Sequence, residues 1–272
     1  MGRPRKPRVN DAIDFWIKSK LRYGSIGGTS VYFAEKFRKL MGDRPILDLK
    51  GSDISDYVNR GQGAPAQRRE INTVKSIVNY WRKMHGHQPL YLDRPRDNAG
   101  RERWLTVEER DQFLAEAPEE LKPIATALFF TGARKGELMK LETEAVDYAR
   151  KTLRLRSLKG GRGEHWRVIP IHDRLWPFIE AAREGGGLVF PGPTGQKWRE
   201  REFYGVWWPH VVRMGLKDFK PHDARHTFAS ELVRQGVSLR VVADLLGHKN
   251  LSMVMRYSHV SAKDGREAIL TL

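Results

Sequence analysis

The stretch HGHQPLYLDRPRDNAGRER, residues 85–103, is the feature that most limits how this chain can fold. It mixes proline, glycine and alternating charges without any apolar period, so neither a helix nor a strand can bury a face there. Apolar patterns of their own flank it on both sides. The 272-residue chain is therefore expected to form two domains, residues 11–86 and 104–272, joined by a linker over residues 87–103.

The N-terminal part predicts a small helical bundle, because its apolar residues recur at helical spacing. Four segments carry this pattern: Ala12, Phe15, Trp16 and Leu21; Val31, Phe33, Phe37 and Leu40; Ile54, Tyr57 and Val58; and Ile71, Val74, Ile77, Val78 and Trp81. Residues 1–10 alternate proline with arginine and lysine, which predicts a flexible basic arm.

The C-terminal part predicts a mixed α+β domain, so the fold class is mainly α with a small β-sheet or hairpin. Thr106 and Glu109 form a capping box that starts its first helix. The alternating runs TLRLRS and HWRVIPI flank the glycine-rich LKGGRGE, a pattern typical of a β-hairpin. A helix beginning near Pro221 is expected to stop at Gly236, and the next to run from Ser238 to Gly247.

Composition narrows the class of partner. The chain has 49 Lys and Arg against 33 Asp and Glu, a net charge of +16, which favours polyanions and above all nucleic acid. A basic surface that only aids solubility is the alternative. The candidate DNA contacts, for which solvated positions are the alternative, are Arg3 and Arg5 in the arm and Arg68, Lys75 and Arg82 in the fourth apolar segment.

Absent residue types exclude several classes of chemistry and of location. The sequence has no cysteine, which rules out disulfides, thiolate catalysis and cysteine-bound zinc. No apolar run approaches the roughly 18 residues of a membrane span, and the N-terminus lacks the apolar segment of a secretory signal. A cytoplasmic protein, at the nucleoid or acting in the cytoplasm of a viral host, is the expectation.

The segment KPHDARHTFAS, residues 220–230, concentrates cationic and hydrogen-bonding side chains at a predicted helix start. His222 and Arg225 share one face near the positive end of that helix, a geometry that suits an anion. HDARH also loosely resembles an HExxH zinc helix, but Asp223 is shorter than the usual glutamate and no third ligand is evident. His226 is then expected to be a buried, hydrogen-bonded histidine.

Five further side chains join this set, although an arginine, lysine or tyrosine in such a position is by itself more often an ordinary surface or core residue. Arg134 follows the break at Gly132, Glu137 could hold a neighbouring guanidinium, Lys159 sits in the hairpin turn, and His248 and Tyr257 follow the last predicted helix. Two arginines, a lysine, two histidines and a tyrosine, without paired metal-binding carboxylates, can bind a phosphodiester without a metal.

Five motifs follow one another over roughly residues 105–260: TGARKGEL, LKGGRGEHWRVIPI, HDARHTFAS, LLGHKN and MRYSH. In content and order they resemble the motifs of the tyrosine recombinase or phage integrase family. Residues 11–86 are similar to the family's core-DNA-binding domain in pattern and position, and residues 104–272 to its catalytic domain. The resemblance implies a site-specific DNA recombinase or integrase that needs no metal, ATP or other cofactor.

The resemblance also implies a role for each matching residue. Tyr257 would attack a DNA phosphodiester to form a 3′-phosphotyrosyl enzyme and a free 5′-hydroxyl. Arg134 and Arg225 would stabilise the charge on the non-bridging oxygens in the transition state.

Three residues would complete the site on the same resemblance. Lys159 would protonate the leaving 5′-oxygen, with Lys151 as the fallback if the hairpin register differs. His222 would assist proton transfer with the nucleophile, and His248 would donate a hydrogen bond to the phosphate.

The expected partners are double-stranded DNA with inverted-repeat core sites and further copies of the chain in a tetramer on DNA, assembled through residues after Ser261. No separate domain for arm-type sites is expected before residue 11. Two rival interpretations remain: a DNA-binding or architectural protein that keeps the fold without the chemistry, and a type IB topoisomerase that relaxes supercoils. A zinc hydrolase ranks below both.

Overall fold

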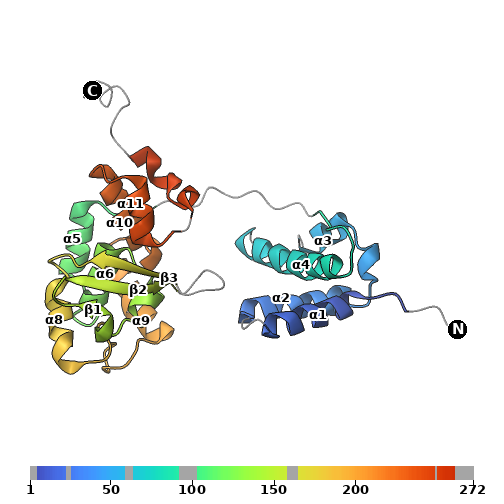
Figure 1. Ribbon diagram of the computed structural model, residues 1–272, viewed down its shortest axis with the longest axis horizontal. Helices are drawn as coiled ribbons and strands as arrows, with labels where there is room; N and C mark the ends of the chain where they lie inside the picture. Colours follow the sequence, from blue (N-terminus) through green and yellow to red (C-terminus); the bar gives the residue numbers. More distant parts are fainter. Residues whose placement is uncertain are drawn as a thin grey trace, which may run out of the picture. The chain divides into compact units, whose positions relative to one another are not determined.

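The computed structural model describes residues 5–22, 26–58, 64–91, 103–157, 165–248 and 250–260. The chain divides into two compact units, Met1–Gly100 and Arg101–Leu272 (Figure 1). Most of the expected linker lies outside the described residues. Within the described residues, no helix has the length and apolarity needed to cross a bilayer.

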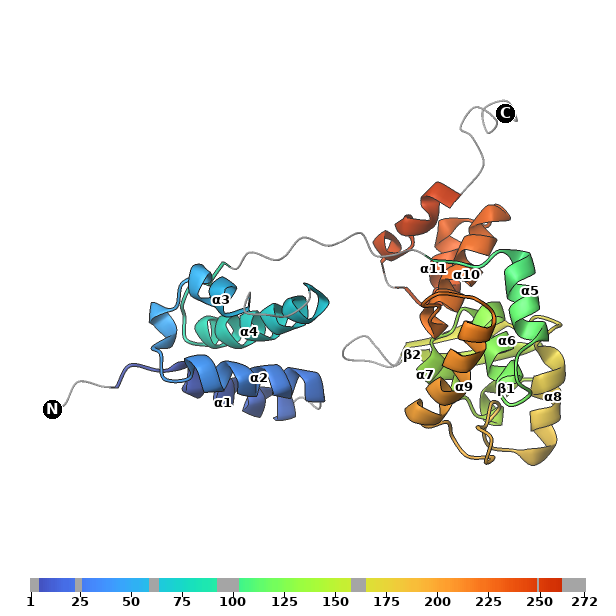
Figure 2. The ribbon, with the colours of Figure 1, turned by 180° about the vertical axis from the view of Figure 1, so that it is seen from behind.

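The N-terminal unit is a helical bundle in which the long α4 packs against the three other helices (Figure 2). Its core is made from one face of each helix, as the apolar spacing predicts, with Trp16, Phe37, Ile54 and Ile77 all buried. The helices are α1 (Val9–Arg22), α2 (Gly28–Met41), α3 (Gly51–Val58) and α4 (Ala64–Met84), with a 3₁₀ turn at Ile46–Asp48.

Residues 9 and 10, which the sequence places in the basic arm, belong to α1 in the structure. Helix α1 begins at Val9, whose side chain is fully buried, and the Pro7 carbonyl oxygen accepts a 3.0 Å hydrogen bond from the Ile46 amide. One apolar residue is enough to anchor this segment in the core. Leu21 and Leu40, near the ends of their helices, are 62% and 53% exposed and lie outside that core.

The candidate DNA-contacting residues of this unit differ in the contacts that they make within the protein. Arg5 pairs with Asp11 at 4.0 Å, and Arg82 Nε donates 2.7 Å to the Gln88 carbonyl oxygen after α4. Arg82 therefore stabilises a turn of its own domain. Arg68 and Lys75 are half-buried on α4, and Arg3 lies outside the described residues.

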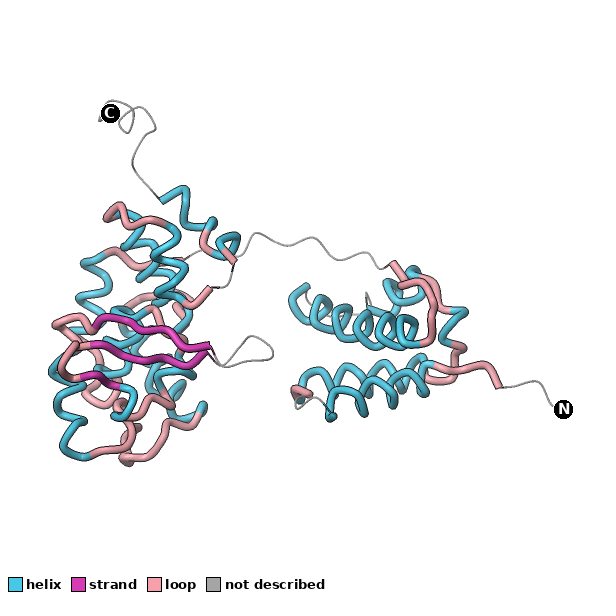
Figure 3. Tube along the Cα trace, viewed as in Figure 1, coloured by secondary structure: helices cyan, strands magenta, loops and turns pink. Residues whose placement is uncertain are grey.

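The C-terminal unit combines helices with one antiparallel sheet in the order β1-β2-β3, shown in magenta in Figure 3. The sequence predicts β2 and β3, whereas β1 is too short to carry a period. The elements are α5 (Val107–Ala115), α6 (Lys122–Thr131), α7 (Lys135–Leu138), β1 (Val146–Asp147), β2 (Thr152–Ser157), β3 (His165–Pro170), α8 (Trp176–Gly185), α9 (Glu200–Arg213), α10 (Pro221–Arg234) and α11 (Leu239–Leu246), with 3₁₀ turns at Thr143–Ala145, Leu251–Met253 and Met255–Val260.

Local signals begin and end these helices as predicted. The Thr106 hydroxyl accepts from the Glu109 amide at 3.2 Å, and the Glu109 carboxylate accepts from the Thr106 amide at 2.9 Å, which confirms the capping box. Ser238 caps α11 by accepting from the Val241 amide, and Gly247 ends that helix in the left-handed region.

The β2–β3 hairpin has one buried and one exposed face. Leu153 pairs with Ile169 on the buried face, and Arg156 pairs with Trp166 on the other. The parity of β3 thus points Arg167 inward between the outward Trp166 and Val168. The connecting residues 158–164, Lys159 among them, lie outside the described residues.

Two apolar clusters support the site. One joins α5, α6, the sheet, α8 and α9 around Phe113, Phe129 and Trp207. The other joins α10 and α11 to the 3₁₀ segment Met255–Val260 and includes Val242 and Tyr257. Both clusters contact α10, and the ends of α6 and α11 are held beside that helix.

Candidate active site

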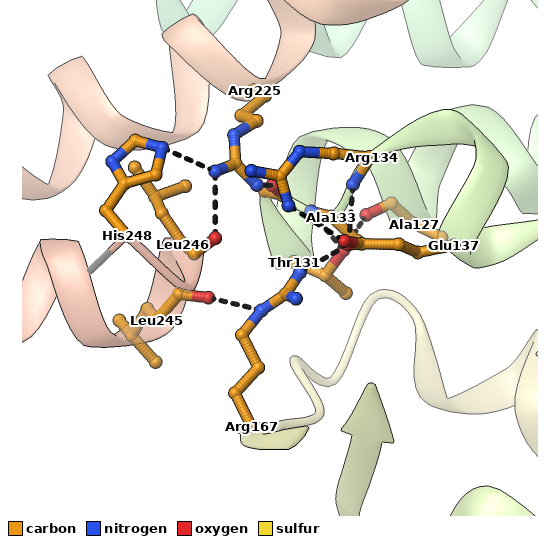
Figure 4. A network of polar contacts seen from close by, with 11 residues as sticks. Ala127, Thr131, Ala133, Arg134, Glu137, Arg167, Arg225, Leu245, Leu246 and His248 are labelled. Atoms are coloured by element: carbon orange, nitrogen blue, oxygen red, sulfur yellow. Dashed lines mark hydrogen bonds and ion pairs between the residues drawn. The ribbon is translucent and has the colours of Figure 1, made fainter. Parts of the chain in front are cut away.

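Arg225, on the second turn of α10, is the most deeply buried cation of the site, with 2% of its surface exposed. Its Nη1 donates 2.7 Å to the Gly132 carbonyl oxygen, and its Nη2 donates 2.8 Å to the Leu246 carbonyl oxygen. These carbonyls stand at the C-terminal ends of α6 and α11, where a helix attracts positive charge. One guanidinium therefore ties together the ends of two helices (Figure 4).

Gly132 makes this arrangement sterically feasible. Its φ of +58° lies in the left-handed region, and a Cβ at this position would come within 2.4 Å of Phe228 Cδ1 and 2.8 Å of Leu246 Cδ2. The glycine ends α6, exposes its carbonyl to Arg225 and turns the chain so that Arg134 starts α7.

A single carboxylate, that of Glu137, holds two more arginines. Arg134 Nη1 donates 2.9 Å to Glu137 Oε1, and Arg167 Nη2 donates 2.6 Å to Glu137 Oε2. Arg167 Nε also donates 2.9 Å to the Leu245 carbonyl oxygen at the end of α11. The expectation that Glu137 holds a neighbouring guanidinium is confirmed, and it holds two (Figure 4).

The charges of this cluster do not balance. Burial alone would raise the pKa of Glu137, but the hydrogen bonds and charges of Arg167 and Arg134 outweigh it and lower the pKa, so the carboxylate is ionised. Burial, and then the charges of Arg134 and Arg167, lower the pKa of Arg225 to about 9, which still leaves it protonated at neutral pH. Three guanidiniums against one carboxylate form a site suited to an anion.

His248 closes the cluster on the α11 side. Its Nε2 lies 2.8 Å from Arg225 Nη2, and since a guanidinium can only donate, this nitrogen accepts and the ring proton sits on Nδ1. Burial, followed by the charges of Arg225 and Arg134, lowers the pKa of His248 to about 4. The neutral ring has a buried Nδ1 with no hydrogen-bond partner among the described residues.

Tyr257 lies in the 3₁₀ segment Met255–Val260 and packs against α10 with 4% of its surface exposed. Its hydroxyl is 2.6 Å from His226 Nδ1. The pKa of Arg225 responds to the charge of Tyr257, so the phenol lies within electrostatic reach of the arginine cluster. His226 is buried and hydrogen-bonded, which confirms that expectation.

His222 occupies the first turn of α10 with an exposed side chain. Its ring meets the ring of His226 edge to face, with centroids 5.0 Å apart. The two histidines of HDARH are therefore adjacent, but His226 Nδ1 faces Tyr257. Among the described residues, no cluster of three or more His, Asp or Glu side chains could hold a metal ion.

Five of the six predicted catalytic residues are described. The structure joins Arg134, Arg225 and His248 in one network, with Tyr257 and His222 beside it on or against α10. The predicted general acid, Lys159, lies outside the described residues. The fallback Lys151 stacks its Nζ 4.7 Å over the Trp176 ring, at the end of β2 opposite to residues 158–164, which argues against that alternative.

Two functional features were missed by the sequence analysis. Arg167 was not singled out, although its inward parity on β3 was a usable signal, since a cation on the buried face of a strand needs a buried partner. The pairing of His226 with Tyr257 had no sequence signal, because it joins residues 31 positions apart.

Comparisons with known proteins find matches over most of the chain. A family model described as the phage integrase family matches residues 103–264. A tyrosine recombinase of Thermosipho africanus is 28% identical over 234 residues, which cover 82% of this chain and 82% of that relative.

Solved structures share the fold. The integrase of the Tn1549 transposon, in complex with circular intermediate DNA, superposes with a TM-score of 0.73 at 16% identity, over 96% of this chain and 98% of that one. A lambda integrase tetramer bound to a Holliday junction superposes with a TM-score of 0.71 at 18% identity, over 96% of this chain and 80% of that one. These likenesses show a mainly helical fold with a small antiparallel sheet in common.

Proposed function

The chain belongs to the phage integrase family and is a site-specific tyrosine recombinase that breaks and rejoins DNA strands, and we propose that Tyr257 is its nucleophile. The phenol oxygen attacks a DNA phosphodiester, forms a 3′-phosphotyrosyl intermediate and releases a 5′-hydroxyl. The covalent bond retains the energy of the phosphodiester, so the strand is resealed without ATP or a metal ion.

The observation that carries this proposal is the excess of buried positive charge beside Tyr257. Arg134 and Arg225 supply guanidinium forks for the two non-bridging oxygens of the phosphate. Negative charge on these oxygens grows in the pentacoordinate transition state, so fixed cations stabilise it more than the ground state. Arg134, with 22% of its side chain exposed, is the fork that is accessible from solvent.

The remaining roles are those that the resemblance to the family implies. Lys159 protonates the leaving 5′-oxygen. His222, exposed at the start of α10, assists proton transfer at the nucleophile. His248 donates a hydrogen bond from Nε2 to the phosphate, after the anion has drawn Arg225 away from that nitrogen and the ring proton has moved there from Nδ1.

The DNA partner is double-stranded, with inverted-repeat core sites, and four copies of the chain assemble on it through residues after Ser261. The lambda integrase tetramer on a Holliday junction, a fold neighbour, supports this assembly. In the N-terminal unit, Arg5, Arg68 and Lys75 are retained as DNA contacts together with Arg3. Arg82 contributes through the turn that it stabilises. We expect the reaction to take place in the cytoplasm, at the nucleoid or in a viral host.

The decisive experiment traps the covalent intermediate. Purified protein is incubated with fragmented host DNA in EDTA, denatured with SDS, trimmed with nuclease and analysed by peptide mass spectrometry. We expect a nucleotide adduct on Tyr257 that is absent from the Tyr257→Phe variant. An adduct on another residue, or one that survives in Tyr257→Phe, would overturn the proposal, and the trapped fragments report the target sequence.

A further inference from the structure

His226 is the side chain whose contact with the nucleophile no role above uses. Its Nδ1 lies 2.6 Å from the Tyr257 hydroxyl, and the two residues are 9% and 4% exposed. A general base must lie about 2.6–3.2 Å from the atom whose proton it takes. His226 satisfies that requirement before any DNA is bound.

The charge state of His226 suits a proton acceptor. Burial lowers its pKa to about 4, helped by the neighbouring charges of His222, Arg256, Arg225 and His248. The ring is therefore neutral at pH 7. With its one proton on Nε2, Nδ1 presents a lone pair to the phenol hydrogen.

Tyr257 needs such a neighbour. A free phenol has a pKa near 10, so only about one molecule in a thousand is ionised at pH 7. Its hydroxyl is turned toward His226 in a region almost closed to solvent, so bulk water is poorly placed to take the proton. The proton must move to a fixed group as the oxygen becomes a nucleophile.

We propose that His226 is a catalytic residue that takes the proton of Tyr257 during strand cleavage. The phenol O–H bond breaks as the oxygen–phosphorus bond forms, and the proton moves to His226 Nδ1. The bond between phosphorus and the 5′-oxygen breaks, and that oxygen is protonated by Lys159. In rejoining, the 5′-hydroxyl attacks phosphorus and returns its proton to Lys159, and the departing phenol oxygen recovers its proton from His226. This inference rests on the proposed role of Tyr257. It makes His226 the first acceptor of the proton, and His222, whose ring meets that of His226, assists the transfer from there.

DNA itself strengthens this base. The cations that weaken His226 include Arg225, which the proposed function pairs with a phosphate. A bound phosphodiester offsets their charge, so His226 becomes more basic when substrate is present, while the effect of burial persists. In the free protein these charges are not offset and His226 is a weaker acceptor, which favours attack in the DNA-bound state.

The test uses His226→Asn, because the asparagine amide can reach the position of Nδ1 and hydrogen-bond to the phenol but cannot take its proton at neutral pH. Single-turnover cleavage is measured at saturating DNA. We expect a loss of at least about 100-fold, with DNA affinity retained. The rate of the variant should rise steadily with pH toward the pKa of the phenol, and the rate of the wild type should rise less.

His172→Asn is the matched control. His172 Nδ1 accepts a 3.1 Å hydrogen bond from the Arg174 amide, a contact that asparagine can retain, and its ring lies against Phe130 away from the arginine cluster. Its cleavage rate and pH profile should match those of the wild type.

A modified substrate separates the two proton transfers. When sulfur replaces the leaving 5′-oxygen, the leaving group departs without protonation, because a thiol is far more acidic than an alcohol. The Lys159→Ala variant should regain its rate on this substrate, whereas His226→Asn should remain slow. Two outcomes would overturn the inference: that the sulfur substrate restores the cleavage rate of His226→Asn, or that this variant cleaves ordinary DNA at the wild-type rate.

The same measurements separate failure of the inference from failure of the proposed function. If the wild type forms no adduct on Tyr257, the proposed function fails. If the wild type forms the adduct and His226→Asn forms it equally fast, only the role of His226 fails. Should His226→Asn unfold, His226→Gln undergoes the same pH and sulfur-substrate assays, with the same outcomes deciding.

Discussion

At the scale of single residues, the site depends on one carboxylate between two arginines. Glu137 is 5% exposed and the Arg167 side chain is 7% exposed, so neither charge can turn to water if the other is lost. A buried ion pair is weak evidence of stability as a whole, but removing one partner leaves an uncompensated charge in the interior.

We therefore expect Glu137→Gln to lower the free energy of unfolding by about 3–5 kcal/mol. Covalent cleavage should fall as well, because the glutamine amide keeps only one acceptor oxygen for the two guanidiniums, so Arg134 and Arg167 are no longer both held in place. Urea unfolding and single-turnover cleavage measure the two effects.

Glu119→Gln is the control at the same scale, since Glu119 pairs with Lys122 at 2.8 Å but its side chain is 85% exposed. Its effect should stay within about 0.5 kcal/mol. Equal losses in the two variants would contradict the buried-pair argument.

At the scale of secondary-structure elements, the junction between α6 and α7 aligns the site. Gly132 ends one helix, offers its carbonyl to Arg225 and starts the turn to Arg134. Gly132 and Arg134 thus belong both to this element boundary and to the surroundings of the proposed phosphate site on Arg225.

Gly132→Ala should destabilise the C-terminal unit by at least about 2 kcal/mol, because a left-handed φ strains alanine and its Cβ would overlap Phe228. Cleavage should fall with it, since Arg225 loses its alignment. Thermal unfolding and adduct formation are the measurements.

Gly205→Ala serves as the comparison, because it should raise the free energy of unfolding whereas Gly132→Ala should lower it. Gly205 lies inside α9, and a Cβ there would meet no atom within 4 Å. Alanine should stabilise the helix by about 0.5–1 kcal/mol and leave cleavage unchanged. A stabilising Gly132→Ala would contradict the steric argument.

At the scale of the whole molecule, the attraction of the basic chain to DNA can be tested separately from the assembly of several copies on DNA. The chain carries a net charge of +16, while residues 261–272 contain Lys263 and Arg266 against Asp264 and Glu267, a net charge of zero. Removing this segment leaves the overall charge that attracts DNA at +16.

Deletion of residues 261–272 should therefore weaken synapsis of two sites more than binding to one site. Gel shifts on single-site and paired-site DNA measure both. The salt dependence of single-site binding, which reports phosphates neutralised, should not change. Equal loss of both complexes would count against the assembly role of this segment.

Much of the fold could be predicted because it depends on local pattern. Helical periodicity predicts the four helices of the N-terminal unit, and the Thr106 capping box and the Gly247 stop depend on contacts within a few residues. The boundary of α1 was less predictable, because Val9 is anchored by packing rather than by its neighbours in sequence. Of the site, Arg134, Arg225, His248 and Tyr257 were identifiable as candidates by residue type and motif order, and their roles stay predictions, as does that of Lys159.

The sequence by itself determined the helical period, the hairpin, the basic charge and the order of the reactive side chains, because each depends on residue type and near spacing. Only the tertiary structure decided which of these side chains touch. The burial of Arg167 against Glu137, 30 positions away, and the contact of His226 with Tyr257, 31 positions away, arise from the packing of β3 and of the segment Met255–Val260. Such contacts form where the apolar faces of distant segments pack against each other, and local sequence pattern does not specify which faces do so.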